Sequence, residues 1–286
     1  VETGQNPTLR PDQALVAAFA KVAAQEYPSL RTSVMAIPAD SESEDPAYVR
    51  NLVAEIASGP SDPFVVLRGA QRWVQRFAPV PLPRPASSPA AAPETWVLLG
   101  GVGSCGRLIG AARAEARPTR LALVSRTPAP ARQQWEAILA DPAQERLAQR
   151  IRHVQQLEAS GAEVLWCAAD VSDEQALRAA LTEVEAAWGT LGTVLFGAAR
   201  FDDTSACLIG ETTREVVEAQ FEAKVNGLRT TERVLRTRAY DACVLMSSNA
   251  STLGGLGMAS YGAAIAFMDA FAERLAQQRQ PWVSAT

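Results

Sequence analysis

The sequence is poor in the residues that build metal and disulfide sites. It has one histidine, His153, and four cysteines that are scattered along the chain without C-x-x-C spacing. Scattered cysteines predict free thiols in a reducing compartment, so we expect a cytoplasmic protein. One histidine and dispersed cysteines also predict that no metal is bound. His153 lies in a charged helical stretch, and we expect it to be a solvated surface residue.

Long apolar runs and an excess of positive charge are missing as well. No apolar run reaches about 18 residues and no secretion signal is recognisable, so neither a membrane span nor secretion is expected. The formal net charge is −4 and the pI is near 5.3, which argues against a nucleic-acid partner. The 286 residues are enough for one large or two smaller domains. Because the first residue is Val1, we expect a piece of a longer polypeptide.

The N-terminal part of the chain alternates helices and strands but contains no glycine-rich phosphate loop. Helices are predicted at 11–26, with Asp12 as the N-cap, and at 46–58. The predicted strands span 32–37, 63–68 and 72–77, and a turn that contains glycine joins the last two. This pattern predicts a small α/β unit over residues 1–78.

A proline-rich stretch follows this unit. Residues 78–93 carry six prolines in sixteen positions. Proline fixes φ and removes a hydrogen-bond donor, so residues 79–93 are predicted to be an extended linker and a domain boundary. Residues 94–286 then form the second domain.

Strands and helices alternate regularly after the linker. The predicted strands span 95–99, 121–124, 163–167, 193–196, 243–246 and the segment that starts at 281. The predicted helices span an insertion at 131–160, the segment 174–188 and a long helix through Lys224 to 235. Alternation of this kind predicts an α/β fold, with a Rossmann-like doubly wound parallel sheet and right-handed crossovers.

A glycine pattern lies where the first of these strands meets a helix. Gly101-x-Gly103-x-x-Gly106 follows residues 95–99 directly. In this context the glycines allow a tight turn and a close approach to a pyrophosphate, which lies on the amides of the helix N-terminus. The pattern therefore predicts a dinucleotide site. The alternative is a glycine turn in a similar sheet that binds no nucleotide.

The end of the next strand predicts which dinucleotide is bound. Ser125 and Arg126 come about twenty residues after Gly106. An acidic residue there would bind the 2′-hydroxyl of NAD, whereas a guanidinium suits the 2′-phosphate of NADP. We therefore expect NADPH. The alternative is an arginine at a strand end that only faces water.

The fifth strand leads into the polar stretch that carries the expected chemistry. Ser248 follows the strand, a glycine-rich loop runs to Gly257, and Tyr261 lies in the first turn of the next helix, thirteen positions after Ser248. This arrangement puts a hydroxyl and a phenol on one rim of the sheet, which is where open α/β sheets bind ligands.

These residues resemble the short-chain dehydrogenase/reductase family, in the version found as the ketoreductase domain of modular polyketide synthases. The spacing of Ser248 and Tyr261 matches, as does Lys224, which stands twenty-four positions before Ser248. The segment Phe267–Ala270 matches too. The resemblance covers nearly the whole chain. It implies that 1–78 is a truncated Rossmann-like structural subdomain that braces the catalytic subdomain, 94–286. The family continues through the sixth strand into a C-terminal lid, whereas this sequence stops at that strand, so we expect no lid in these 286 residues.

The resemblance also implies the reaction. It is NADPH-dependent reduction of a β-ketoacyl thioester, carried on an acyl carrier protein, to the β-hydroxyacyl form. Tyr261 would be the general acid, Lys224 would favour its phenolate, and Ser248 would hydrogen-bond the substrate oxygen. The expected partners are the acyl carrier protein and other domains of the same multienzyme.

The glycine pattern, the end of the second strand and the family resemblance together predict eleven cofactor-binding residues. They are Gly100, Gly101, Gly103, Ser104 and Gly106 in the loop, Ser125 and Arg126 at the 2′-phosphate, Asp170 and Val171 beside the adenine, and Ala198 and Ala199 beside the nicotinamide ribose. The family has threonine where Leu99 stands and glycine where Ser104 stands. These two departures predict a reduced affinity for the cofactor.

Position 265 is the main departure from the family. Ile265 stands where the family has asparagine, one helical turn after Tyr261 and on the same face. Isoleucine can hold neither the lysine nor a relay water, and losing such a group commonly lowers the rate about 10²- to 10³-fold. Reduction is favoured because the other three residues are present. The rivals are a redox-silent scaffold domain and an epimerising domain that binds cofactor without net reduction.

Two family marks of product stereochemistry are partial. Phe201-Asp202-Asp203 resembles the mark of the subtype associated with a D-configured β-hydroxyl, shifted by one residue. Leu253 stands where the other subtype has tryptophan. The sequence therefore leans towards the first subtype.

Overall fold

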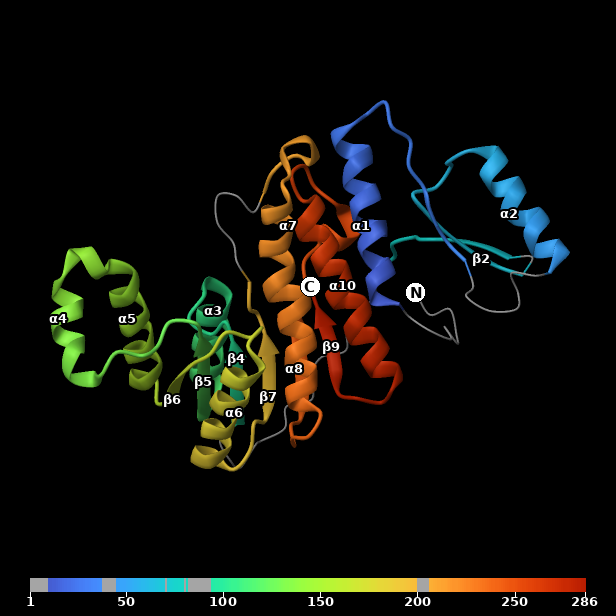
Figure 1. Cartoon of the computed structure of the whole chain (residues 1–286). Coiled ribbons are helices and arrows are strands. Elements are labelled where there is room, and N and C mark those ends of the chain that lie inside the picture. The colour runs from blue at the N-terminus through green and yellow to red at the C-terminus, as the bar shows by residue number, and fades with distance from the viewer. Residues whose placement is uncertain (1–9, 38–44, 70, 80, 82–93, 200–205) are drawn as a thin grey trace. The chain divides into compact units, whose positions relative to one another are not determined.

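The computed structural model describes residues 10–37, 45–69, 71–79, 81, 94–199 and 206–286 (Figure 1). The chain divides into two compact units, each of which is described by itself. One comprises Val1–Ser87, Phe201–Val217 and Ser247–Arg274, and the other comprises Ser88–Arg200, Glu218–Met246 and Leu275–Thr286. The predicted linker lies almost wholly outside the described residues, and so does the stereochemical mark at 201–203.

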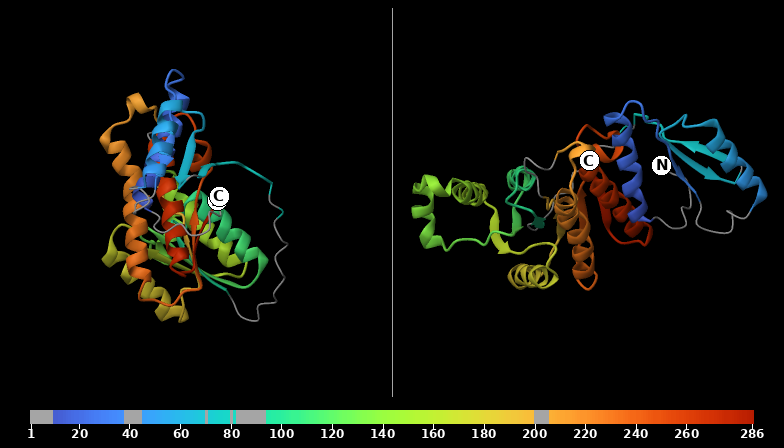
Figure 2. Two further views of the ribbon diagram at one scale, coloured as in Figure 1. Left: turned by 90° about the vertical axis from the view of Figure 1, so that its right-hand side faces the viewer. Right: turned by 45° about the horizontal axis from the view of Figure 1, so that its top comes forward.

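The first unit contains a small three-stranded sheet. Its strands are β1 (Val34–Ala36), β2 (Phe64–Arg68) and β3 (Gln71–Val74). β1 and β2 run parallel, and β3 runs antiparallel to β2. Helix α2 (Pro46–Ser58) begins at the N-cap Asp45, whose carboxylate accepts from the Ala47 amide, and the helix lies against this sheet (Figure 2). The predicted helix 46–58 and the predicted hairpin are confirmed, but the hairpin's second strand ends at Val74 instead of residue 77, and the predicted strand 32–37 is shortened to Val34–Ala36.

The same unit contains helix α1 (Pro11–Glu26), helix α9 (Ala250–Leu253) and most of helix α10 (Ala259–Gln277). The predicted N-cap of α1 is wrong. Arg10 is the N-cap, and Pro11 occupies the first turn, where its missing N–H needs no partner. Asp12 lies one residue inside the helix instead, where a carboxylate suits the positive end of the helix dipole.

The second unit is built on a six-stranded parallel sheet in the order β6-β5-β4-β7-β8-β9. Its strands are β4 (Glu94–Leu99), β5 (Thr119–Ser125), β6 (Glu163–Ala168), β7 (Thr193–Phe196), β8 (Ala242–Met246) and β9 (Trp282–Ala285). β4 is the first of these along the chain, yet it lies between the second and the fourth. The chain thus winds outward from β4 in both directions, as in a doubly wound Rossmann-like fold. The predicted fold class is confirmed.

Five helices described in this unit pack on the sheet or on one another. They are α3 (Ser104–Ala116), α4 (Trp135–Ala140), α5 (Glu145–Ala159), α6 (Glu174–Trp188) and α8 (Gly227–Leu235). α3 contacts α5, and α6 contacts α8. α4 and α5 replace the single predicted insertion at 131–160, because Asp141 leaves the helical conformation and Pro142 cannot continue the α4 hydrogen bonds. Leu98, Leu121 and Leu157 belong to the apolar core beneath them.

His153 is buried, so the prediction of a surface residue is wrong. Its side chain is 6% exposed, and its Nε2 has no hydrogen-bond partner. The charged neighbours Arg150 and Arg152 suggested solvent, but His153 lies one turn before the buried Leu157. Burial, with Arg107 as a lesser cause, lowers the pKa of His153 to about 4.

The long helix predicted through Lys224 has a change of pitch inside it. Helix α7 (Arg214–Phe221) passes into the π-helical segment η5 (Glu222–Asn226), which leads into α8. A π-helical turn adds a residue to the local repeat and often marks a functional site. Lys224 lies at the centre of this turn.

Within the described ranges, no helix combines the length and the apolar character that crossing a bilayer requires.

Candidate active site

The glycine loop joins the end of β4 to the start of α3, as predicted. Gly100 has φ +90°, and a Cβ on Gly106 would lie 2.7 Å from the Gly101 Cα and 2.8 Å from the Gly100 carbonyl oxygen. Only glycine fits such an approach. The N-cap of α3, Gly103, provides no side-chain hydrogen bond to the first amides of the helix. A helix N-terminus in this state suits a phosphate group.

The end of β7 meets the glycine loop at the centre of the sheet. A Cβ on Gly100 would lie 2.9 Å from the Gly197 carbonyl oxygen and 3.1 Å from the Ala198 Cα. The Gly197 amide donates to the Leu99 carbonyl at 2.9 Å. Strand order reverses between β4 and β7, and open α/β sheets bind ligands at such a switch point. The predicted positions Gly100 and Ala198 are therefore neighbours, and Ala199 is exposed beside them.

The predicted 2′-phosphate residues end the neighbouring strand. The Ser125 hydroxyl donates to the Thr127 carbonyl at 2.8 Å and accepts from the Trp166 Nε1 at 3.0 Å. These bonds fix the turn after β5. Arg126 is exposed directly after the strand, so its guanidinium is open to a ligand. Ser104, the first residue of α3, is exposed as well, so its side chain does not fill the loop.

The predicted adenine pair lies in the turn after β6. Asp170 Oδ1 accepts from the Ser172 amide at 2.9 Å and from the Ser172 hydroxyl at 2.7 Å. Val171 is 6% exposed. A Cβ on Gly227 would lie 2.6 Å from the Val171 Cγ2, so the glycine that follows Lys224 by three residues lets its helix pack on this turn. The lysine helix is thereby tied to the edge of the sheet that carries the glycine loop.

Lys224 is buried within this second unit. Its side chain is 2% exposed, and its ammonium donates a 2.8 Å hydrogen bond to Gln220 Oε1. Burial lowers the pKa of Lys224 to about 8. The amine is therefore mainly protonated at neutral pH, yet it loses its proton far more easily than an exposed lysine.

Ser248 and Tyr261 lie in the first unit, where the intervening loop is well tied. The Ser248 hydroxyl accepts from the Ala250 amide at 3.2 Å, and the Ser251 hydroxyl donates to Asp269 Oδ2 at 2.8 Å. A Cβ on Gly262 would lie 3.1 Å from the Ala250 carbonyl oxygen. Gly262, next to Tyr261, therefore packs against Ala250, which follows Ser248 closely. This contact brings the two segments together as predicted.

The loop between Ser248 and Tyr261 differs from the prediction in one respect. It contains the single helical turn of α9, and Leu253, at the predicted subtype position, ends this turn. Tyr261 lies in the first turn of α10, as predicted, and is half-buried. Ile265, one turn later, is only 1% exposed. Position 265 is therefore a buried apolar site in this chain.

Helix α1 holds this loop by side chains that sequence reasoning did not single out for this role. Gln25 Oε1 accepts from the Gly255 amide at 2.7 Å, and Gln25 Nε2 donates to the Leu253 carbonyl at 2.8 Å. Glu26 accepts from the Gly257 amide at 2.9 Å and from the Ile209 amide at 2.6 Å. Lys21 donates to the Thr252 carbonyl. Side chains of the N-terminal helix thus satisfy backbone groups of the loop between Thr252 and Gly257.

The structure thereby brings the predicted residues together in two groups. The glycine loop lies with the ends of β5, β6 and β7 and with the helix of Lys224, and Ser248 lies with the start of the Tyr261 helix. Gln220 was missed, although its position four residues before a helical lysine is the spacing of a side-chain pair. Among the described residues, His, Cys, Asp and Glu side chains form no group of three that could hold a metal ion.

The doubly wound parallel sheet with a glycine loop at its central strand defines the chain as a Rossmann-like α/β protein. A family model described as "KR domain" matches residues 94–286. The chain therefore belongs to the KR domain family, the ketoreductase domains of polyketide synthases.

Relatives and solved structures agree with this membership. The chain is 34% identical over 192 residues to 6-methylsalicylic acid synthase of Aspergillus terreus, which covers 67% of this chain and 10% of the synthase. It is 28% identical to the pikromycin polyketide synthase component PikAIII of Streptomyces venezuelae, over 92% of this chain and 16% of that protein. The chain thus spans a small part of these relatives.

Two ketoreductase structures match almost the whole chain. One is PlmKR1, from the first module of phoslactomycin biosynthesis in Streptomyces sp. HK803, with a TM-score of 0.77, 27% identity and coverage of 99% of this chain and 60% of that one. The other is an A-type ketoreductase from a modular polyketide synthase, with a TM-score of 0.79, 23% identity and coverage of 99% and 56%. At that identity the second likeness shows the fold alone.

Proposed function

We propose that this chain reduces the β-keto group of a polyketide intermediate, held as a thioester on an acyl carrier protein, to a β-hydroxyl group. The observation that carries the proposal is Lys224, a lysine 2% exposed whose burial lowers its pKa to about 8, at the family's spacing from Ser248 and Tyr261. Burial disfavours the charged form of an amine and lowers stability, so a buried lysine supports a functional role for that side chain.

The residues of the chain would divide the proton chemistry among them. As the carbonyl carbon gains a hydride, its oxygen becomes an alkoxide, and the Tyr261 phenol donates a proton to that oxygen. The ammonium of Lys224 stabilises the phenolate that is left, because an opposite charge favours the ionised form. The Ser248 hydroxyl donates a hydrogen bond to the same substrate oxygen and orients the carbonyl.

The cofactor that we propose is NADPH, which would supply the hydride when bound. The glycine loop fits its pyrophosphate, because any Cβ on Gly106 would fill the cradle and the α3 N-terminus has no side-chain cap. Arg126, exposed at the end of β5, would hold the 2′-phosphate. Asp170 and Val171 would lie beside the adenine, and Ala198 and Ala199 beside the nicotinamide ribose.

The proposal extends to organisation and partners. The small sheet belongs to a structural subdomain, 1–78, and residues 79–93 link it to the catalytic subdomain, 94–286. Substrate would arrive on an acyl carrier protein, and other domains of one multienzyme would act before and after this one. The matched relatives are long synthases of which this chain spans 10% and 16%, which supports a domain within an assembly line.

The second candidate is a ketoreductase-like domain without net reduction, either redox-silent or epimerising. The observation that favours it is Ile265, which is 1% exposed and offers no polar atom where the family has an amide. Such a domain would keep the fold and its partners. An epimerising domain would also keep the cofactor.

The deciding experiment follows NADPH oxidation by absorbance with a β-ketoacyl N-acetylcysteamine thioester. We expect turnover that Tyr261→Phe abolishes and that Ile265→Asn raises. The matched control is Tyr27→Phe, which removes the hydroxyl of an exposed tyrosine and should leave the rate unchanged. NADPH binding measured by fluorescence, without any turnover, would favour the second candidate. If neither the native chain nor Ile265→Asn binds NADPH, both the reducing and the epimerising proposals are wrong.

A further inference from the structure

A buried pair of side chains lies inside the helix that carries the lysine. Gln220 is 1% exposed and Lys224 is 2% exposed, and the ammonium donates to the Gln220 Oε1 at 2.8 Å. The two residues are four positions apart, so their side chains lie on one face of the helix. The pair is wholly within the second unit.

The backbone around this pair changes pitch and is packed against the parallel sheet. Lys224 lies in the π-helical segment Glu222–Asn226, whereas Gln220 lies in the last turn of α7 before it. Gly227, just after this segment, packs against Val171 at the edge of the parallel sheet. The backbone around the pair is therefore held from outside the helix, and the amide oxygen holds the flexible four-carbon side chain of the lysine from within.

The neutral amide of Gln220 is suited to accept a hydrogen bond from a buried ammonium. A buried ammonium needs acceptors for its hydrogens, because an unsatisfied buried polar group is costly. A carboxylate would satisfy it but would also strengthen its hold on the proton. A glutamine oxygen is neutral, so it fixes the direction of the ammonium without adding a charge.

We propose that Gln220 is the positioning residue of Lys224, which holds the ammonium in the orientation that reduction requires. The proposal deepens the proposed function and rests on it. Gln220 touches no reacting atom in this scheme and acts through the lysine.

The kinetic test compares two deletions of an amide hydrogen bond in the same helical region. Gln220→Met keeps the volume and loses the acceptor, and we expect kcat to fall on the order of 10- to 100-fold with KM within about 3-fold, because misplacement of a catalytic group acts mainly on the chemical step. Asn226→Leu is the matched control. It removes the exposed 2.7 Å bond from Asn226 to Glu222, two residues after the lysine, and should leave kcat within about 2-fold.

A conservative variant separates positioning from packing. Gln220→Glu keeps both the length and an acceptor but adds a negative charge beside the ammonium, so it should recover part, and not all, of the kcat that Gln220→Met loses. If both variants lose kcat equally while their melting temperatures stay at the native value, the acceptor has no role and the proposal is wrong.

A readout independent of activity uses the scarcity of lysine. The chain has two lysines, Lys21 and Lys224, so protein labelled with 15N-lysine gives two side-chain ammonium signals. Gln220→Met should shift the Lys224 signal and speed its proton exchange, whereas the Lys21 signal stays in place. An unchanged Lys224 signal would overturn the proposal. A shifted signal in a protein that shows no reduction dependent on Tyr261 would instead overturn the proposed function and leave the role of Gln220 in orienting the lysine intact.

Discussion

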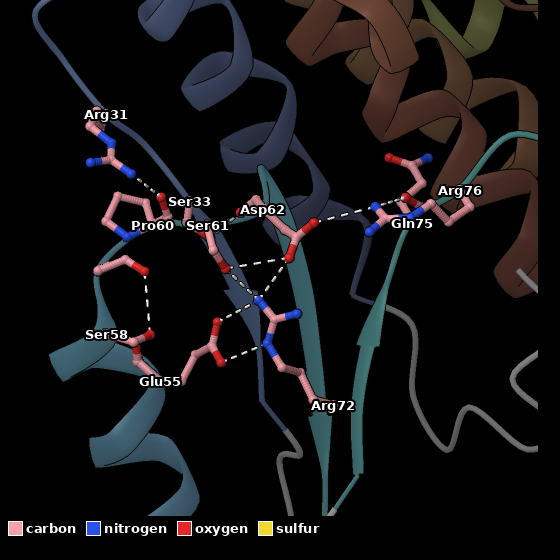
Figure 3. Close-up of polar contacts among 11 residues, drawn as sticks. Arg31, Ser33, Glu55, Ser58, Pro60, Ser61, Asp62, Arg72, Gln75 and Arg76 are labelled. Atoms are coloured by element: carbon pink, nitrogen blue, oxygen red, sulfur yellow. Dashed lines mark hydrogen bonds and ion pairs between the residues drawn. The ribbon is translucent and has the colours of Figure 1, made fainter.

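The two sheets of this protein are stabilised in different ways. Among the described residues, the core of the small sheet buries Tyr48, Val65 and Leu67, and charged side chains form hydrogen bonds at its polar edge. There Arg72 donates to both carboxylate oxygens of Glu55 at 2.7 and 2.8 Å and to Asp62 at 2.9 Å (Figure 3). The parallel sheet instead buries a broad layer of leucine, isoleucine and valine against its helices.

This difference in stabilisation bears on which unit can hold buried polar side chains. Exposed ion pairs hold an edge in place but contribute little free energy, since water and salt screen them. A large apolar core can tolerate buried polar groups, and both His153 and Lys224 lie in the unit of the parallel sheet. The small sheet fits the structural role that we propose for residues 1–78, and Lys224, for which we propose a catalytic role, lies in a helical segment of the unit that contains the parallel sheet.

The largest effect is expected from the core of the parallel sheet. Leu121 is fully buried there, so Leu121→Ala should lower the free energy of unfolding by about 4 kcal/mol, through lost transfer energy and a residual cavity. Leu67→Ala, at 3% exposure in the small core, should lower it by about 2 kcal/mol, because a smaller core collapses more easily around the gap.

Urea unfolding combined with hydrogen exchange, resolved by peptide, measures this comparison. Leu67→Ala should raise exchange in β1 to β3 and leave the strands of the parallel sheet protected. Equal losses in both sheets would contradict the division into a weak and a strong region.

Acid is expected to lower the stability of the protein through the buried His153. His153 has a folded pKa of about 4 against an ordinary value of 6.5. The unfolded chain therefore binds a proton between these values that the folded chain refuses, so stability falls as pH drops from 6.5 to 4, by on the order of 3 kcal/mol. His153→Leu should remove this slope. Unfolding free energies at pH 7, 5.5 and 4.5 would show it, and an unchanged slope in the variant would refute the buried histidine as its cause.

The buried Lys224 is expected to lower the free energy of unfolding at neutral pH. Lys224 has a folded pKa of about 8 against 10.5 in the unfolded chain, so its burial destabilises the protein fully below pH 8 and ceases to do so above pH 10.5. Lys224→Met should therefore stabilise the protein at pH 7. The pKa shift corresponds to on the order of 3 kcal/mol, from which about 1 kcal/mol is lost with the Gln220 hydrogen bond.

The same variant should have no reductase activity, since it removes the charge beside the proposed acid. Melting temperatures at pH 7 and pH 10 give the measurement, and the gain should shrink at the higher pH. A variant that is less stable than the native chain at both values would speak against a functional reason for burying this amine.

The smallest effect is expected at the edge of the small sheet. Hydrogen bonds from Arg72 lower the pKa of both Glu55 and Asp62. The pair contributions are thus present above the ordinary values of 4.5 and 3.8 and are lost as pH falls through the lower folded values. Arg72→Gln should therefore weaken this sheet slightly at pH 7, and the difference from the native chain should shrink as pH falls below the ordinary carboxyl values.

Salt provides the control for this prediction. The small loss in Arg72→Gln should diminish further in 1 M NaCl, because the Debye length there is about 3 Å. A loss that persists at high salt would mean that Arg72 acts by packing rather than by charge.

Much of the fold followed from local patterns. Helices 11–26, 46–58 and 174–188 and strand 193–196 have the predicted bounds, since proline, caps and apolar spacing act within a few residues. The glycine loop before α3 was partly predictable for the same reason, because a Cβ on Gly106 would meet the backbone of Gly100 and Gly101, whereas the close approach of Gly100 to Gly197 is a long-range contact. The roles of its residues in binding NADPH stay predictions, as do those of Ser248 and Tyr261.

Burial and long-range contacts were less predictable. His153 follows two nearby arginines, Arg150 and Arg152, in the sequence and is nevertheless buried, and the N-cap of α1 is Arg10 rather than Asp12 because Pro11 occupies the first turn. Gln25 and Glu26 hold a loop about 230 positions away in the chain. Their polar side chains give no local sign of that contact.

The sequence by itself determined the order of strands and helices, the glycine turn and the spacing that places this chain in its family, because these depend on the conformational preferences of neighbouring residues. Only the tertiary structure decided that Lys224 is buried with Gln220 and that Gly227 lies on Val171. Desolvation and close packing depend on surfaces that meet only when distant segments fold together, so no local pattern specifies them.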